Sequence, residues 1–399
     1  MSTKIFQRIA GLLVTFTLLV LTACSSVQMA TPGPTPAQSP AVPQGTFVYV
    51  GGIAESPDSV FPTSDTDELT SYRVQPDGSL KRLGAFDRSA LPQAIFESAA
   101  AGPWFFTCDA SGNCLEFRVD DTGNLVHGAD ISKTHLIQIA GIDPAGKWLI
   151  ASDALGEHAF RIQADGTLAA GPDTPAPPQP PGTNPGLLSF FIMRFDPTGN
   201  FAFARNLTGL SEDPAVYRFN SNNGTFTRVS SLPGLGVTAI ESIFMGFTSD
   251  GRHAIGVQKP SAGPGGDVYI FDWDSNAGIL SVHSHGIMNL TDVSDFFPGF
   301  MAFADDFVFV EGGISDNVVL RFDPLTATLS DTGQRFPNDA VENGPLFADA
   351  RTHTVIGTAP DGNLVGIWKY DPTTGATQTV SGSPYPAAQH AYILEVLSH

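Results

Sequence analysis

Six polar residues stand where short apolar stretches of this chain end, and their side chains could do chemistry together. Carboxylate, amide and guanidinium groups that converge on one place can orient a sugar or a small organic acid through charge-assisted hydrogen bonds. The six residues are Asp109, Asp153, Arg205, Asn206, Gln258 and Glu311. The alternative is that these groups only satisfy hydrogen bonds between neighbouring sheets, which buried polar groups require in any case.

A second set of polar residues falls on apolar stretches that would form neighbouring strands. They are Glu97, Gln138, Arg194, Glu241 and Asp349. If the sheets form a ring, both sets would surround the mouth of a central channel. Binding residues concentrate on variable loops held by a rigid scaffold, so we expect the site on the face that carries the long connections. These connections include residues 54–67, 172–186, 207–215, 259–266, 286–297 and 381–389.

His283 and His285 are two residues apart on an expected strand, so they would share one face of a sheet and could share a metal ion. No third ligand stands out in the sequence, and exposure to solvent is the simpler explanation. The sequence also lacks a Gly-x-Ser-x-Gly elbow, a His-Glu-x-x-His pair and a phosphate loop. We therefore expect neither a metal nor a cofactor.

The elements that must position these residues repeat along the chain. Residues 188–229 contain four short strand-like stretches separated by turn signals. The turn before the fourth strand recurs with its central residue at Gly78, Gly123, Gly166, Gly224, Gly278, Ala327 and Gly375. The period is therefore 43 to 58 residues. A period of about 40–50 residues with four strands is the signature of a β-propeller blade.

A second series of turns alternates with the first and falls between the first and second strands of a repeat. Its members are residues 143–146, 196–199, 249–251 and 304–306. We therefore predict an all-β fold, a seven-bladed β-propeller of four-stranded antiparallel blades. The first repeat begins at residues 47–50 with what matches a second strand, and a lone strand over residues 391–397 ends the chain. Pairing of these two ends would close the ring and remove two exposed edges.

The N-terminus has the pattern of an export signal. Lys4 and Arg8 precede an apolar run over residues 9–21, which is short for a membrane span. The sequence Leu-Thr-Ala-Cys that ends at Cys24 resembles the lipobox of bacterial lipoproteins. The resemblance implies cleavage before Cys24 and a lipid on its thiol, and the alternative is an ordinary secretory signal.

These features predict three segments. Residues 1–23 would be the signal peptide, residues 24–44 the lipidated cysteine with a flexible tether rich in proline, serine and threonine, and residues 45–399 the propeller domain. The lipid would anchor the protein to a membrane of the cell envelope, the outer membrane if the organism has one.

The charge of the chain excludes some partners. It has 40 acidic and 20 basic residues, which gives a formal net charge of −20. A field of this sign repels phosphate backbones and phosphorylated substrates, so we do not expect nucleic-acid binding.

Two cysteines flank the loop between the second and third strands of the second repeat. They are Cys108 and Cys114. Since strands joined in this way are antiparallel neighbours and export exposes thiols to oxidising conditions, we expect a disulfide bond between them.

The repeats resemble the lactonase-type seven-bladed propellers, which include the relatives of 6-phosphogluconolactonase and shade into the YVTN repeat proteins. The resemblance is closest over residues 143–153 and 196–206, where the turn Asp-Pro-x-Gly precedes a strand. It extends from about residue 45 to the C-terminus. Enzymes of this family carry histidines and an acid at the entry to inner strands. Here residues 91–94 and 188–191 contain no histidine, and only Glu241 matches the acid.

Three functions follow from these features. The leading hypothesis is an extracytoplasmic binding or interaction module whose long-connection face takes a carbohydrate, a small organic acid or an envelope protein. The alternative is a hydrolase of an unphosphorylated sugar lactone, with Glu241 or Asp153 as the catalytic base. A third possibility is a structural scaffold in an envelope complex.

Overall fold

The computed structural model describes residues 44–52, 68–87, 95–109, 114–131, 138–153, 156–175, 190–206, 215–231, 244–258, 266–288, 301–312, 316–337, 345–359, 364–387 and 391–398. All regular elements in these ranges are β-strands, and the ranges contain no helix long and apolar enough to cross a membrane. The expected signal peptide, Cys24 and nearly all of the expected tether lie outside them.

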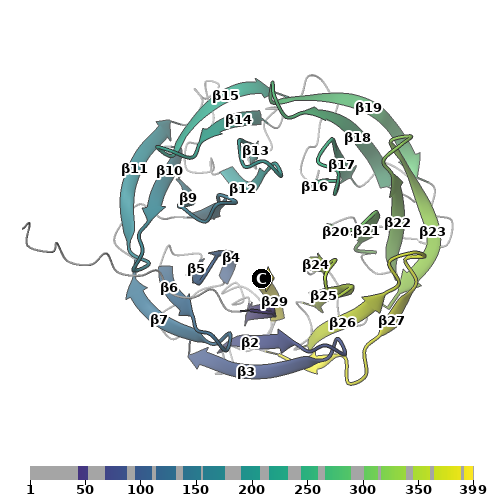
Figure 1. Ribbon diagram of the computed structural model, residues 1–399, viewed down its shortest axis with the longest axis horizontal. Helices are drawn as coiled ribbons and strands as arrows, with labels where there is room; N and C mark the ends of the chain where they lie inside the picture. The colour runs from purple at the N-terminus through teal and green to yellow at the C-terminus, as the bar shows by residue number, and fades with distance from the viewer. Residues whose placement is uncertain are drawn as a thin grey trace, which may run out of the picture. The chain divides into compact units, whose positions relative to one another are not determined.

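The described strands form seven antiparallel sheets, which are arranged as the blades of a β-propeller (Figure 1). Blade 1 consists of β29 (Ala391–Ser398), β1 (Thr46–Gly52), β2 (Glu68–Val74) and β3 (Leu80–Asp87). Blade 2 consists of β4 (Ile95–Ala101), β5 (Trp104–Asp109), β6 (Cys114–Val119) and β7 (Leu125–Asp130). Blade 3 consists of β8 (Gln138–Ile142), β9 (Trp148–Asp153), β10 (Gly156–Ile162) and β11 (Leu168–Pro175). The predicted fold class is confirmed.

The remaining blades follow the same order from the channel outward. Blade 4 consists of β12 (Phe190–Phe195), β13 (Phe201–Asn206), β14 (Ala215–Asn220) and β15 (Thr225–Ser231). Blade 5 consists of β16 (Phe244–Phe247), β17 (His253–Gln258), β18 (Gly266–Asp274) and β19 (Ile279–Met288). Blade 6 consists of β20 (Met301–Ala304), β21 (Phe307–Val310), β22 (Asn317–Asp323) and β23 (Thr328–Phe336). Blade 7 consists of β24 (Leu346–Asp349), β25 (Thr354–Ala359), β26 (Leu364–Tyr370) and β27 (Thr377–Thr379), with β28 (Tyr385–Pro386) also paired to β26.

The C-terminal strand closes the ring. β29 pairs antiparallel with β1, from Thr46 opposite Ser398 to Gly52 opposite Ala391. The N-terminal and C-terminal strands thus build one blade together, as the missing inner strand of the first repeat predicts.

Left-handed backbone marks the turn before the fourth strand in every blade. All seven marker residues of the sequence repeat have positive φ, between 48° at Ala327 and 93° at Gly123. Glycine reaches this region without a steric penalty, which explains its recurrence, and Ala327 is the exception. Gly102 and His353 occupy the corresponding turns between first and second strands in blades 2 and 7, which the sequence series did not include.

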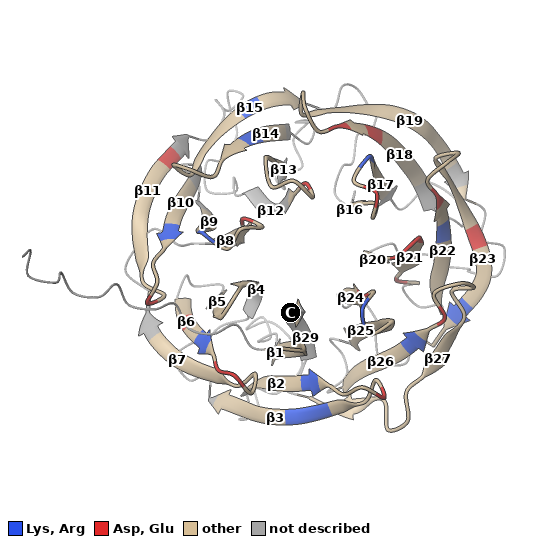
Figure 2. Ribbon diagram, viewed as in Figure 1, with Lys and Arg blue, Asp and Glu red and all other residues tan. Residues whose placement is uncertain are grey.

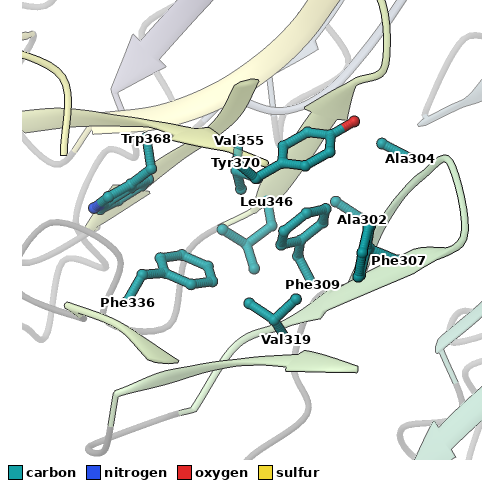
Figure 3. Packing of buried hydrophobic residues seen from close by; sticks show 10 residues of the cluster. All are labelled: Ala302, Ala304, Phe307, Phe309, Val319, Phe336, Leu346, Val355, Trp368 and Tyr370. Carbon is teal, nitrogen blue, oxygen red and sulfur yellow. The ribbon is translucent and has the colours of Figure 1, made fainter. Parts of the chain in front are cut away.

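The core lies between the blades. Each buried apolar cluster joins two neighbouring blades rather than filling one sheet. The cluster between blades 6 and 7 packs the tilted rings of Phe309 and Phe336 against Tyr370 and Trp368, with Leu346 in the same cluster (Figure 3). Neighbouring blades therefore stabilise one another, and a single blade could not bury its own faces.

One residue pair recurs where the second strand begins. In five blades an aromatic residue of the second strand lies directly opposite an arginine of the third strand. The pairs are Phe47–Arg73, Trp104–Arg118, Trp148–Arg161, Phe201–Arg218 and Phe307–Arg321. Figure 2 shows the basic residues on β2, β6, β10, β14 and β22.

In two of these blades the arginine also reaches the following blade. The guanidinium of Arg218 lies 4.7 Å from the centre of the Phe201 ring, and its Nη2 donates a hydrogen bond of 3.3 Å to the carbonyl of Asn276. Arg321 makes the same connection to the carbonyl of Thr373, at 3.5 Å. We call this arrangement of aromatic ring, arginine and neighbouring turn the arginine latch.

Candidate functional site

Polar residues from five consecutive blades end their second strands on one face of the ring. β5, β9, β13 and β17 end at Asp109, Asp153, Asn206 and Gln258, and Glu311 follows β21 directly. Because all second strands of a propeller run in the same direction, these residues share the face that carries the long connections. The structure thus brings together, by strand position, five of the six strand-end residues, and Arg205 immediately precedes Asn206.

Glu311 shows how this end of blade 6 is built. Its side chain is buried, with 1% of its surface exposed. The next amide, of Gly312, donates a 3.1 Å hydrogen bond to Oδ1 of Asn317, whose Nδ2 donates to the carbonyl of Pro337 at 3.3 Å. A fully buried Asn317 therefore fixes the backbone that carries the carboxylate, so that Glu311 is held on a rigid support.

The polar residues predicted on the inner strands do not all lie on one face of the ring. Glu97 lies opposite Cys108 and Gln138 opposite Ser152, so both are near the long-connection face. Inner strands run opposite to second strands, and Arg194, opposite Phe203, therefore lies toward the short turns.

Asp349 also lies at the short-turn end, not at the expected mouth. It is the last residue of β24, and its Oδ2 accepts hydrogen bonds from the hydroxyls of Thr46 at 2.7 Å and Thr352 at 3.0 Å. This carboxylate joins blade 7 to blade 1. The direction of the inner strand explains the difference, because its last residue is on the opposite face from its first.

Other predicted residues lie outside the described part of the chain. Glu241 precedes β16, which begins at Phe244, and most residues of the long connections are likewise outside it, although residues 381–387 are described and contain β28. The placement of Glu241 at the channel mouth therefore stays a prediction.

Cys108 and Cys114 form a disulfide bond across the hairpin of β5 and β6. They are direct partners in the strand register, their Cα atoms are 4.1 Å apart, and both are buried. The bond lies at the long-connection end of blade 2, beside Asp109.

His283 and His285 do not share a face. The register of β18 with β19 shifts at Ile270 and Phe271, so that His283 occupies a β-bulge and the alternation of side chains breaks there. His285 stacks on Tyr269 with ring centres 4.1 Å apart, whereas Nδ1 of His283 lies 3.2 Å from the carboxylate of Asp272. In the described ranges no group of three histidine, cysteine or acidic side chains could hold a metal ion.

A polar cluster that the sequence did not reveal joins blades 6 and 7 on the short-turn face. The hydroxyl of Tyr370 donates a 2.8 Å hydrogen bond to Oδ2 of Asp305, and Nδ1 of His353 lies 3.6 Å from the same oxygen. Burial, together with the hydrogen bond to Asp305, raises the pKa of the Tyr370 phenol well above its usual range. Asp305 and His353 both have positive φ, 52° and 49°, in turns where other blades have glycine. Non-glycine residues at these two turn positions are the feature of the sequence that could have revealed the cluster.

Another titratable group lies between blades 2 and 3. Glu116 on β6 is 3% exposed, and burial, followed by the nearby charge of Asp165, raises its pKa to about 7. The side chain faces the turn at Gly166, away from the strand ends described above. We therefore expect the raised pKa of Glu116 to affect the stability of the fold and not the candidate site.

Comparison with known proteins gives similarity at the level of structure. No family model and no curated protein matches the chain. A protein from Bacteroides uniformis, provisionally named a 6-phosphogluconolactonase, superposes with a TM-score of 0.63 at 14% identity, over 89% of this chain and 99% of that one. The periplasmic gluconolactonase of Pseudomonas aeruginosa superposes with a TM-score of 0.60 at 16% identity, over 88% of this chain and 99% of that one.

A second provisionally named 6-phosphogluconolactonase, from Bacteroides fragilis, gives a TM-score of 0.60 at 14% identity, over 88% of this chain and 98% of that one. These superpositions establish a shared architecture, and the resemblance noted in the repeats is confirmed at the level of the fold. The chain has the fold of the lactonase-type seven-bladed β-propellers.

Proposed function

We propose that this protein is an exported, lipid-anchored propeller that binds an unphosphorylated sugar acid or the corresponding lactone at the long-connection mouth of its channel. The observation that carries the proposal is the convergence of polar strand-end residues from five consecutive blades on one face. Amide, carboxylate and guanidinium groups at such positions suit a ligand with many hydroxyl groups and one carbonyl or carboxyl group.

Two further observations support this class of ligand. The structurally similar proteins include one named as a periplasmic gluconolactonase, which by its name acts on a sugar lactone outside the cytoplasm. The formal net charge of −20 opposes the approach of phosphorylated sugars. An unphosphorylated ligand therefore fits both the charge and the proposed location.

The binding proposal is tested on residues 40–399, which form one compact unit. Calorimetric titration with an aldonolactone and its aldonate should show saturable binding, and the 6-phosphorylated aldonate should bind at least tenfold more weakly. Asp153→Asn should weaken binding, whereas Asp121→Asn, in a short turn on the opposite face, should not. Equal binding of the phosphorylated compound, or no binding at all, would refute the proposal.

Lactone hydrolysis is the second candidate, because the Pseudomonas aeruginosa neighbour is named a gluconolactonase. A carboxylate base, Glu241 or Asp153, would take a proton from water, whose oxygen attacks the lactone carbonyl. The ring ester bond then breaks, and the ring oxygen leaves as a hydroxyl after protonation. Acid release from an unphosphorylated lactone, abolished by Glu241→Gln or Asp153→Asn, would establish this activity. Binding without acid release would limit the protein to binding.

The anchor has its own test. Cys24 follows the lipobox-like residues 21–23, and lipidation should place the full-length protein in the membrane fraction. Cys24→Ala should move the mature protein to the soluble fraction and prevent incorporation of labelled fatty acid. A membrane-bound variant would exclude this mode of anchoring without affecting the binding proposal.

A further inference from the structure

The outer strand of each blade has one edge with no neighbouring strand in the described part of the chain. Such edges can pair with another chain, and proteins prevent this with charged residues, with proline or by keeping the edge strand short. Most outer strands of this propeller have such a protection. β3, β7, β15 and β23 contain charged residues, β11 contains a charged residue and two prolines, and β27 has only three residues.

β19, the outer strand of blade 5, has none of these protections. It contains no acidic residue, lysine, arginine or proline, and at ten residues it is the longest described strand. In Figure 2 it carries neither the acidic nor the basic colour, whereas β3 and β23 are coloured. Its bulge at His283 does not set it apart, because the pairings of β3, β15 and β23 also contain a register shift.

The same strand exposes aliphatic side chains. Ile279 and Val282 are 48% and 47% exposed, and all residues from 281 to 286 are exposed. A side chain at Gly286 would meet nothing within 4 Å, so the backbone of another strand can approach closely there. A long, uncharged edge with exposed aliphatic groups is the kind of edge at which chains associate.

A cleft of about 420 Å³ lies beside β19, at the seam with blade 6. Its apolar lining comes from Val268, Ile270, Met288 and Leu329. Side chains alternate along β18, so Asp274 lies on the same side of the sheet as Val268 and Ile270. Ile279 is the register partner of Asp274, and its side chain therefore lies on the cleft side of the sheet. One strand thus carries an exposed isoleucine at its start and an apolar cleft near its end.

We propose that β19 pairs antiparallel with β19 of a second copy of this chain, around a twofold axis at the middle of the strand. Full overlap places Ile279 of each copy opposite Met288 of the other, so that each exposed isoleucine reaches the cleft of the other copy. This reciprocity is what a twofold interface requires. The edge is on the outer rim of the ring (Figure 1), so the inference does not depend on the proposed sugar site.

Charge favours a second copy as the occupant of this edge. Like charges directly opposite each other destabilise a strand pair, and β19 brings none when it pairs with itself. β3, with Lys81 and Arg82, would place like charges close together in the same arrangement. The formal net charge of −20 opposes association of two whole chains, so higher salt should strengthen the dimer by screening that repulsion.

Sedimentation equilibrium of residues 40–399 tests the proposal. One pair of strands is smaller than a stable interface, so we expect a reversible dimer with a Kd on the order of 10 µM. Ile279→Lys should weaken association at least tenfold. Val229→Lys is the matched control, because Val229 is 37% exposed on β15, the outer strand of blade 4, and this variant should dimerise as the parent protein does.

Three results would overturn the proposal. They are equal losses of association in the two lysine variants, a dimer that weakens as salt is raised, and a parent protein that stays monomeric at millimolar concentration. The last result would leave the edge to an extended segment of a different protein.

Crosslinking tests the pairing independently of any effect on folding. The only cysteines of residues 40–399 are Cys108 and Cys114, which form a disulfide bond, so an added cysteine is the single free thiol. Ser284 lies next to the proposed axis, and Ser284→Cys should give a disulfide-linked dimer on oxidation with copper phenanthroline.

Ser281→Cys is the matched control for Ser284→Cys, because both are exposed serines of β19. In the proposed pairing the two copies of Ser281 are offset by about 17 Å along the strands. Cysteines whose Cα atoms are more than about 7 Å apart cannot be bridged, so this variant should stay unlinked. No linkage of Ser284→Cys, or equal linkage of both variants, would overturn the antiparallel pairing.

Discussion

Trp148 of blade 3 lies directly against Gly224 in the turn of blade 4. A Cβ atom on Gly224 would stand 2.7 Å from Cζ3 of the indole, and the indole Nε1 donates a 2.8 Å hydrogen bond to the carbonyl of Ser221 in the same turn. The glycine is therefore required by the close approach of the ring as well as by its φ of 77°.

Gly224→Ala should destabilise the domain by about 3 kcal/mol, from left-handed backbone and overpacking together. Gly333→Ala provides the control, because Gly333 has a similar φ of 73° but a Cβ there would meet nothing within 4 Å. It should cost only about 1 kcal/mol. Urea unfolding of both variants measures the difference, and equal losses would show that the indole moves aside.

The arginine latch should contribute modestly to stability where Arg218 and Arg321 form it. Replacing Arg218 by alanine removes its contact with Phe201 and its hydrogen bond to Asn276, and should cost about 0.5–1 kcal/mol. Arg218→Lys should recover only part of this loss, since lysine lacks the planar group that stacks on the ring. Arg228→Ala, an exposed position on β15, is the control and should change the free energy of unfolding by less than about 0.5 kcal/mol.

The disulfide bond between Cys108 and Cys114 should stabilise the domain by about 2 kcal/mol, because it closes a short loop in the unfolded chain. Thermal unfolding of the parent protein with and without a reducing agent measures this contribution. The double variant Cys108→Ala with Cys114→Ala should be less stable and should not respond to the reducing agent. If the parent protein does not respond either, the bond is absent or inaccessible to reduction.

Glu116 should make stability depend on pH between about 4.5 and 7. Its pKa is raised to about 7 in the folded protein from 4.5, so the folded state favours the protonated form. The stabilisation of the folded state that comes from protonating Glu116 is therefore fully present below pH 4.5, and it is lost as the pH rises through 7. Glu116→Gln should be more stable than the parent protein at pH 8, by on the order of 3 kcal/mol, and equal to it at pH 4.

The variant Asp165→Asn tests the second cause of the raised pKa of Glu116. Removing the Asp165 charge should lower the pKa of Glu116 and shift the window of pH dependence downward, because that charge is the second cause of the raised pKa. Urea unfolding between pH 4 and 8 gives the three profiles. A parent profile with the same slope as that of Glu116→Gln would contradict the assignment.

Much of this fold follows from local rules that are visible in the sequence. The turn before each fourth strand needs one residue with positive φ, and that requirement appears as a repeated glycine at Gly78, Gly123 and Gly375 among others. Even Ala327, the degenerate member of the series, has the same backbone conformation. Ring closure was predictable as well, because a propeller that begins on a second strand needs a first strand from elsewhere.

Local sequence patterns could not place most polar residues considered for function, because their positions depend on a β-bulge, on strand direction and on contacts between blades. Alternation along a strand predicts that His283 and His285 share a face, but a β-bulge, which needs one extra residue and no special side chain, separates them. The prediction that Arg194 and Asp349 lie at the channel mouth neglects the direction of the inner strand, which puts both residues near the short turns. The cluster of Tyr370, Asp305 and His353 depends on contacts between blades, which no local pattern reports.

The pairing of β29 with β1 also bears on when this protein can fold. Blade 1 lacks its innermost strand until residues 391–398 have been made, although β1 begins at Thr46. A nascent chain therefore cannot seal the ring, and contacts of such large sequence separation form slowly. The blades therefore cannot all be complete until the last residues of the protein have been synthesised, so the final step of folding comes after translation.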